Sequence, residues 1–256
     1  MRIPGQLQLM QFSGPKPYRL DLLGFSGLNV MVLAPHPDDF DAIGVTMRKL
    51  RDNGNSIQLE VLSSGSGVED SFCSPPTFEN KAAIREQEQR ESCRFFGLPE
   101  CCLEFPPLEL DAEAQPLDSP ANTALVLALI ERSKPDLVFL PHGNDTNSGH
   151  RQVWAMSRRA AGSFGRPLTA FYNHDPKTIS LRVDALMVFD DDLAPWKGEL
   201  LRFHRSQQHR NLLHRGYGLD ERILRTNRKL AQDLGFPGKL AEGFELEHFG
   251  ATRPAP

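Results

Sequence analysis

A histidine and two aspartates follow one apolar segment of the chain within four positions. His36 and Asp39 lie three residues apart in the segment PHPDD, a spacing at which a tight turn can present an imidazole nitrogen and a carboxylate oxygen to one metal ion. Zinc accepts such a mixed set of ligands. We expect the third ligand to be His150, which ends a polar loop after a second apolar segment. Three protein ligands would leave one position of the metal open for water.

The adjacent pair Asp38 and Asp39 indicates what reaction such a metal would support. One carboxylate can bind the metal while the other takes a proton from the bound water, whose pKa the metal lowers. The alternative is a turn in which an aspartate only caps the following helix. The first interpretation predicts a metal-assisted hydrolase.

Strands and helices alternate along the sequence that must position these residues. The apolar patterns predict strands at 28–34, 57–62, 102–105, 136–140, 168–172 and 179–189, and helices at 41–51, 79–96, 122–132, 151–161, 196–210 and 219–234. The segment after residue 235 is expected to be irregular. This order is typical of an α/β fold, here a Rossmann-like, mostly parallel sheet with helices on both faces. The loops after the strands should meet at the carboxyl edge of the sheet, where ligands bind.

We expect a single domain over residues 1–256, with a core at about 28–210 and a C-terminal helix and tail at 219–256. Lysine and arginine number 29 against 33 acidic residues, a net charge of −4 that argues against nucleic-acid binding. The four cysteines show no CxxC spacing, and neither a signal peptide nor a membrane-spanning run is recognisable. A cytoplasmic location without stable membrane insertion follows as an expectation. The sequence leaves both a monomer and a homo-oligomer open.

Five segments together resemble one known family. They are VLAPHPDDFDAIG at 32–44, SSG at 63–65, IREQE at 84–88 leading to Phe-Gly, KPDLVFLPHGNDTNSGHR at 134–151, and Lys197 followed by HRSQ at 204–207. They are similar, in the same order, to the motifs of the LmbE-like or PIG-L zinc-dependent N-deacetylases, among them N-acetylglucosaminyl-phosphatidylinositol de-N-acetylase. The resemblance implies a zinc hydrolase that removes an N-acetyl or other N-acyl group from an amino sugar or a glycosylated metabolite.

The resemblance also implies roles for individual residues. The family's zinc ligands fall on His36, Asp39 and His150, and its general base falls on Asp38. Iron(II) is an alternative to zinc, because two imidazoles and a carboxylate suit either metal. The candidate substrate contacts are Arg85, Ser64, Gly65 and His204.

Two positions depart from the family pattern. Phe40 replaces a glutamate, and Asp41 is expected either to substitute for that glutamate or to face solvent. Asn147 replaces a histidine, and its amide can donate to an oxyanion but cannot deliver a proton. The leaving amine would then receive its proton from Asp38, or from His142 or His204. Asp38, Asn147 and His142 are therefore the catalytic candidates.

Other interpretations remain open at this point. The acyl group need not be acetyl, which would make the chain an amidase for another N-acyl compound or a thiol conjugate. The two departures also suit a metal- and sugar-binding protein that has lost turnover. A basic stretch containing Arg202, Arg205, Arg210 and Arg215 would either line an entrance for anionic or polar substrates or form a solvated helix face.

Overall fold

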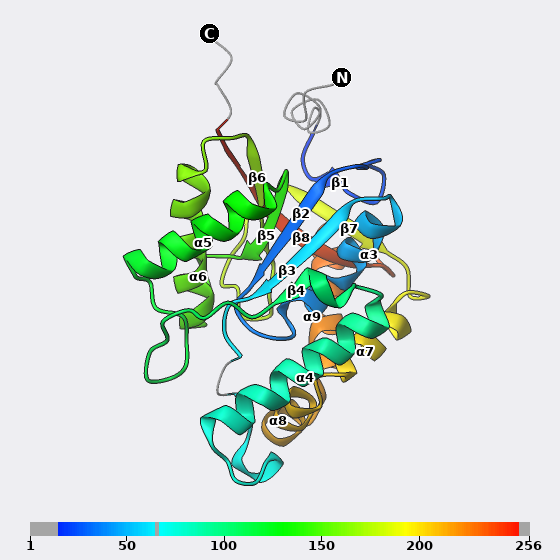
Figure 1. Ribbon diagram of the computed structural model, residues 1–256. Coiled ribbons are helices and arrows are strands. Elements are labelled where there is room, and N and C mark those ends of the chain that lie inside the picture. The colour runs from blue at the N-terminus through cyan, green and yellow to red at the C-terminus, as the bar shows by residue number, and fades with distance from the viewer. Residues whose placement is uncertain (1–14, 65–66, 251–256) are drawn as a thin grey trace.

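A single eight-stranded sheet organises the chain in the computed structural model, which describes residues 15–64 and 67–250 (Figure 1). The strand order is β1-β7-β8-β6-β5-β2-β3-β4. The strands are β1 (Tyr18–Arg19), β2 (Asn29–Ala34), β3 (Ser56–Val61), β4 (Leu103–Glu104), β5 (Leu137–Pro141), β6 (Leu168–Asn173), β7 (Ala185–Phe189) and β8 (Leu240–Phe249). Strands β6, β5, β2, β3 and β4 run parallel to one another, and β1 runs parallel to β7, whereas β8 is antiparallel to both β6 and β7. The predicted α/β fold with a mostly parallel sheet is confirmed.

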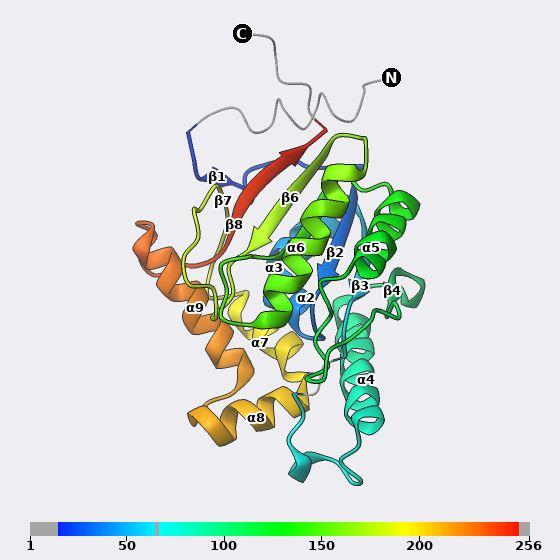
Figure 2. The same cartoon turned by 90° about the vertical axis from the view of Figure 1, so that its left-hand side faces the viewer.

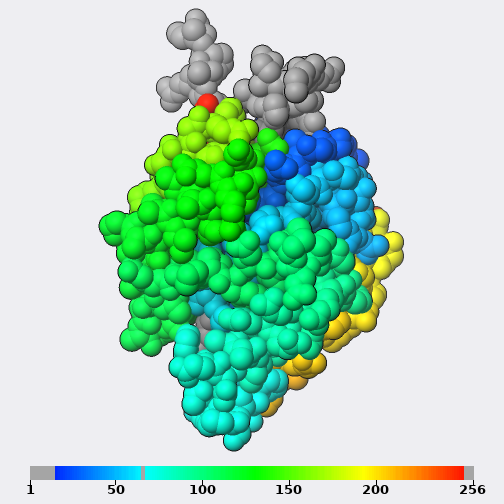
Figure 3. Space-filling view, viewed as in Figure 1, coloured from blue at the N-terminus to red at the C-terminus, as the bar shows by residue number. Residues whose placement is uncertain are grey.

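Helices cover both faces of this sheet (Figure 2). They are α2 (Asp39–Ala42), α3 (Gly44–Asp52), α4 (Phe78–Phe96), α5 (Pro120–Ser133), α6 (Ser148–Ser163), α7 (Ala194–Arg202), α8 (Arg205–Arg215) and α9 (Leu219–Asp233). Successive side chains of a strand point to opposite faces. Accordingly, Met31 and Leu33 of β2 pack with α5 and α6, whereas Val30 and Val32 pack with residues of α3 and α7. In Figure 3 the segment around α4, in cyan, forms the lower end of the molecule.

The C-terminal part of the chain differs from the sequence-based expectation. Residues 240–249, expected to be irregular, form β8 near the middle of the sheet. This strand buries the carboxylate of Glu242, which accepts a hydrogen bond from the equally buried Lys197 ammonium at 2.7 Å and from the backbone N–H groups of Val45 and Thr46. An acidic residue tolerates such burial only when it is paired and hydrogen-bonded.

Two further boundaries differ from the prediction. The helix expected at 196–210 is split into α7 and α8, which are separated by Phe203 and His204. At the start of α8 the buried Glu88 carboxylate accepts hydrogen bonds from the Ser206 N–H and hydroxyl, and this cap begins a new helix. The strand expected at 179–189 is shorter, because only Ala185–Phe189 pair with β8.

No helix among the described residues is both long and apolar enough to cross a membrane. The four cysteines all carry free thiols.

Candidate metal centre

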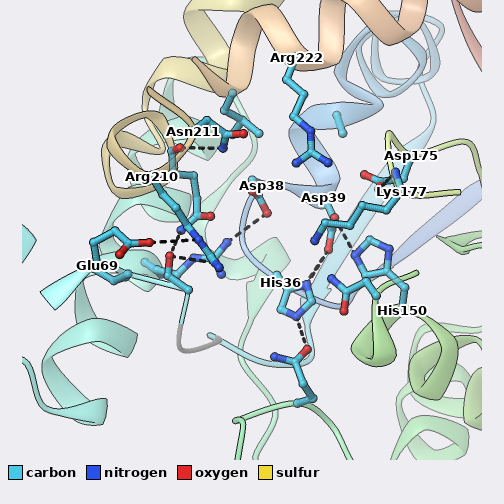
Figure 4. Close-up of a pocket in the computed structure, with 18 of the residues that line it drawn as sticks. His36, Asp38, Asp39, Glu69, His150, Asp175, Lys177, Arg210, Asn211 and Arg222 are labelled. Carbon is cyan, nitrogen blue, oxygen red and sulfur yellow. Dashed lines mark hydrogen bonds and ion pairs between the residues drawn. The ribbon is translucent and has the colours of Figure 1, made fainter. Parts of the chain in front are cut away.

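The carboxyl ends of three neighbouring parallel strands open into one cavity of about 790 Å³ (Figure 4). The loop after β2 supplies His36, Asp38 and Asp39. The segment after β5 supplies His150, and the loop after β6 supplies Asp175. The side chains therefore meet where a parallel sheet places its ligand sites.

The turn between β2 and α2 adopts an uncommon backbone conformation. Asp38, the residue before α2, has a φ of 100°. Side chains other than glycine rarely adopt positive φ, and such strain is found where a functional site requires it. The Asp38 N–H donates to the Gln89 side chain at 3.1 Å, and the Asp39 carboxylate accepts a hydrogen bond from the His36 N–H at 2.8 Å. These bonds hold both carboxylates of the pair at the cavity.

The three predicted metal ligands come together in this cavity. His36 Nδ1 lies 3.4 Å from one carboxylate oxygen of Asp39, and His150 Nε2 lies 3.5 Å from the other. One potential ligand atom from each of the three residues lies within 4.8 Å of the other two, a spacing that can hold a metal ion. The two histidines are buried, and the imidazole centroids are 5.5 Å apart.

The outer nitrogen of each imidazole already has a hydrogen-bond partner. His36 Nε2 lies 2.8 Å from Gln115 Oε1, and His150 Nδ1 lies 3.2 Å from the Asp145 carboxylate. An amide oxygen and a carboxylate are both acceptors, so each outer nitrogen carries the proton in the neutral ring. The inner nitrogens, His36 Nδ1 and His150 Nε2, are then left as lone pairs directed at Asp39. Acceptors that orient metal-binding histidines in this way are typical of metal sites.

Three acceptor groups therefore face one another, and the arrangement requires a positive charge between them. Burial disfavours an imidazolium, but the carboxylates of Asp39 and Asp145 outweigh burial and raise the pKa of His150 to about 9. Burial likewise opposes ionisation of Asp39, yet the two histidines hold its pKa well below the usual range. Two imidazole nitrogens and one carboxylate are a donor set that fits zinc or iron(II).

Gly149 allows this close packing. A Cβ atom at this position would lie 2.1 Å from Gln115 Oε1 and 3.2 Å from the His36 ring. Any side chain here would displace the acceptor that fixes the His36 proton. Ser148 and Gly149 stand where the family pattern has a Pro-Asp pair, and the missing side chain of Gly149 leaves room for Gln115.

Three further candidates from the sequence also line the cavity: Asp38, Arg85 and Asn147. Arg85, from α4, is 4% exposed and donates to the Asp38 carboxylate at 3.1 Å and to the Pro37 carbonyl. Asn147 caps α6, because its side-chain oxygen accepts from the Gly149 N–H at 3.0 Å. Its amide nitrogen is left to serve as a donor in the cavity.

The remaining candidates that the structure describes do not line the cavity. Ser64 donates to Glu86 at 2.6 Å, and Gly65 lies outside the described residues. His142 contacts Glu245 of β8 at 3.2 Å. His204 is completely buried behind α2, with its Nε2 atom 2.5 Å from Asp41. Neither His142 nor His204 is therefore among the residues that line this cavity.

Phe40 and Asp41 also point away from the site. Phe40 is fully buried, and its ring packs edge-on against Phe96 with centroids 5.0 Å apart. Asp41 is 0% exposed, so the expectation that it faces solvent is wrong. Its carboxylate accepts hydrogen bonds from Gln89, Ser92 and His204, and is therefore unavailable to replace the missing glutamate.

Several residues at the cavity were not found from the sequence. Asp145 precedes His150 by five positions in a polar loop, a weak signal of its role. The others carry no recognisable motif; they are Gln115, Asp175, Lys177, Asn211 and Arg222. Burial raises the pKa of Asp175, and the nearby carboxylates of Asp39 and Asp145 add to this effect, although His150 opposes it.

Comparisons with known proteins identify a family and similar folds. No curated protein sequence matches the chain significantly. Among solved structures, the fold is similar to that of N,N'-diacetylchitobiose deacetylase from Pyrococcus horikoshii, with 20% identity, a TM-score of 0.67 and coverage of 96% of this chain and 93% of that chain. It is also similar to GalB, the 4-carboxy-2-hydroxymuconate hydratase from Pseudomonas putida KT2440, with 17% identity, a TM-score of 0.63 and coverage of 89% and 98%.

A third similar structure is a zinc-inhibited form of the teicoplanin deacetylase Orf2, with 12% identity, a TM-score of 0.64 and coverage of 87% of this chain and 99% of that chain. At these identities the likenesses show a common fold. The family described as PIG-L, GlcNAc-PI de-N-acetylase, matches residues 31–161, about half of the chain, and this stretch includes all three candidate ligands. The chain therefore belongs to the PIG-L family.

Proposed function

We propose that this protein is a metal-dependent N-deacetylase that removes an N-acetyl or other N-acyl group from an amino sugar or a glycosylated metabolite. The observation that carries the proposal is the set of three acceptors, His36 Nδ1, His150 Nε2 and the Asp39 carboxylate, directed at one point in the cavity. Zinc is the metal we propose, with iron(II) as the alternative. Membership of the PIG-L family and the deacetylases among the similar structures support the reaction.

His36, Asp39 and His150 would hold the metal. When bound, it would supply a Lewis acid and would lower the pKa of water. Asp38 is the base in this proposal, because its carboxylate lies at the cavity and carries no metal-ligand role. Arg85 orients this carboxylate through the 3.1 Å hydrogen bond. The Asn147 amide nitrogen would donate to the oxygen of the acyl group as negative charge develops there.

The proton for the leaving amine comes from Asp38 in this proposal. Of the three predicted donors, His142 and His204 do not line the cavity, which leaves Asp38. The same carboxyl group would thus accept a proton from water and return it to nitrogen. The products are a carboxylate, acetate for an N-acetyl substrate, and a free amine.

The test is acetate release from a panel of N-acyl amino sugars by wild-type protein and by Asp38→Asn. We expect the variant to keep its metal and to lose about 10²- to 10⁴-fold in kcat, the usual contribution of a general base. Asp52→Asn, on the exposed face of α3, makes the same chemical change away from the cavity and should leave kcat unchanged. Unchanged turnover in Asp38→Asn at full metal occupancy would exclude Asp38 as the base.

A second candidate function is the hydration of a carbon–carbon double bond. Two observations favour it: GalB, a hydratase, has this fold, and Asn147 cannot protonate an amine. The two reactions are separable, because hydration of a conjugated diene removes its ultraviolet absorbance and releases no acetate. Tight substrate binding with neither product would instead indicate a binding protein that has lost turnover. Longer acyl chains in the panel test the amidase alternative.

The proposed partner is a small molecule and the proposed location is the cytoplasm. The four cysteines are all free, including the adjacent pair Cys101 and Cys102. Free thiols are compatible with a reducing compartment.

A further inference from the structure

A second, smaller cavity of about 290 Å³ adjoins the metal cavity and has a different electrostatic character. Its lining includes four cations, Lys177, Arg210, Arg215 and Arg222. Among the described residues that line it there is no carboxylate. Lys177, Arg210 and Arg222 also line the metal cavity, so one ligand can extend from one cavity into the other. We refer to this smaller cavity as the cationic pocket.

Three of these cations have no directly bonded acidic partner among the described residues. The side chains of Lys177, Arg215 and Arg222 form neither a hydrogen bond nor an ion pair with any other residue in the described part of the chain. Arg210 pairs with Glu69 at 3.3 Å and donates to the Gly67 carbonyl at 3.5 Å. Unpaired cations held close together repel one another, and the arrangement costs free energy unless an anion binds.

Arginines elsewhere on the same helices behave differently. Arg205 at the start of α8 pairs with Glu91 at 2.8 Å, and Arg225 of α9 pairs with Glu221. Arg228 of α9 likewise has an acidic partner at 3.3 Å, as does Arg202 at the end of α7, at 2.9 Å. The two arginines of α8 and α9 without an acidic partner in the described ranges, Arg215 and Arg222, thus both line the cationic pocket.

Arg222 connects the two cavities. It is half-buried, and in Figure 4 its guanidinium points from α9 into the space above Asp38 and Asp39. Burial lowers the pKa of Arg222, and the proximity of Arg215 adds to this effect, while Asp175 and Asp38 oppose it. Beside it, Asn211 is 6% exposed and its Oδ1 atom has no hydrogen-bond partner. A buried acceptor without a partner indicates a site where a ligand donates a hydrogen bond.

We propose that the cationic pocket binds a doubly charged anionic group of the substrate, a phosphate monoester or a dicarboxylate, while the N-acyl end of the same molecule reaches the metal centre. The cations of Arg215, Arg222 and Lys177 contact the anion, and Asn211 Oδ1 accepts a hydrogen bond from a hydroxyl group in the part of the molecule that joins the two ends. Arginine recognises both anions through paired, charge-assisted hydrogen bonds. The assignment of the N-acyl end rests on the proposed function, whereas anion binding does not.

Calorimetric titration of the purified protein with inorganic phosphate and with malonate tests the pocket without requiring turnover. We expect Arg215→Gln/Arg222→Gln to weaken binding of the preferred anion about tenfold or more, since each charge-assisted bond contributes roughly 1.5–3 kcal/mol. The double variant Arg205→Gln/Arg225→Gln removes the same charge from the same helices and should bind like wild type. The anion that binds more tightly, phosphate or malonate, identifies which anionic group the pocket prefers. Equal binding by wild type and the pocket variant would overturn the proposal.

A second measurement links the pocket to the reaction. We compare kcat/KM for N-acetylglucosamine 6-phosphate and for uncharged N-acetylglucosamine, and expect a preference of about tenfold or more for the phosphate, expressed mainly in KM. The pocket variant should lose this preference, and the control variant should keep it. Anion binding without acetate release from either sugar would reject the deacetylase while the pocket stands. Acetate release with no charge preference in either protein, together with no anion binding, would reject the pocket while the deacetylase stands.

Discussion

The four-residue helix α2 carries two aspartates whose surroundings are opposite. Asp39 faces the cavity, where the inner nitrogens of His36 and His150 approach it at 3.4 and 3.5 Å. Asp41, two positions later, faces the interior and accepts hydrogen bonds from Gln89, Ser92 and His204. Both pair with histidine, and both lie near the same turn.

The difference lies in where the protons are. At Asp41 each of the three neighbours donates to the same carboxylate oxygen, Oδ2, whereas Oδ1 is buried without a hydrogen-bond partner among the described residues. At Asp39 the outer nitrogens face the acceptors Gln115 and Asp145, so that in the neutral rings the inner nitrogens are lone pairs directed at the carboxylate. The same two residue types therefore make a structural contact on one side of α2 and a candidate metal site on the other.

Removal of a ligand should have the largest effect on function. His150→Ala should abolish stoichiometric zinc and lower the rate of the proposed reaction about a thousandfold or more, because the reaction depends on the metal. Metal analysis and initial rates measure both. His209→Ala, which changes an imidazole outside the cavity near Phe72, is the matched control. Retention of zinc in His150→Ala would remove this residue from the ligand set.

A change at the interior aspartate should act on stability instead. Asp41→Ala leaves the buried His204, Gln89 and Ser92 groups without their common acceptor, and we expect the free energy of unfolding to fall by about 3–5 kcal/mol. Urea denaturation measures the loss. Folded Asp41→Ala should still bind one equivalent of zinc. A loss of zinc at unchanged stability would contradict the division between the two aspartates.

The acceptor behind His150 should have an intermediate effect. Asp145→Ala removes the group that holds the outer-nitrogen proton, and we expect metal affinity to fall about 10- to 100-fold. Competition with a chelator of known affinity measures it. Asp145→Asn keeps an oxygen acceptor and should lose less. Equal affinities in the alanine variant and wild type would show that the orientation of His150 does not depend on Asp145.

The pH dependence should be the most gradual of these effects. With a pKa of about 9, His150 carries a proton in the metal-free protein at pH 7. A metal must displace that proton, so affinity should rise about tenfold per pH unit below pH 9 and level off above it. The metal-free protein should lose stability as the pH rises from 6.5, the ordinary pKa of histidine, to about 9, since a raised histidine pKa stabilises the fold only while the group is protonated. An affinity that does not change between pH 7 and 9 would contradict the placement of this proton.

The sequence predicted those parts of the fold that depend on local patterns. Apolar runs located β2, β3, β5 and β6, and the pairing of parallel strand ends brought His36 and His150 to one edge. It failed at β8 because the burial of Glu242 depends on Lys197, 45 residues away. The break before α8 likewise depends on Glu88, which lies 118 residues from the Ser206 it caps.

The residues of the site likewise fall into two groups, those that local motifs predict and those that only the fold brings together. His36, Asp38 and Asp39 lie in one short motif and His150 in a second, so spacing was enough to select them. Gln115 comes from a loop without a motif, and its role depends on its position against one ring nitrogen. For Arg222 the informative property is the lack of an acidic partner, which only the packed helices reveal.

The place of β8 in the sheet has a consequence for synthesis of the chain. A ribosome produces this strand last, yet it lies between β6 and β7, which leave the ribosome much earlier. Until β8 is made, β6 presents an unpaired edge that can template aggregation. A nascent chain therefore remains dependent on protection until β8 has been made, and a chain terminated before β8 by a nonsense mutation should be removed by quality control rather than accumulate as a partly active fragment.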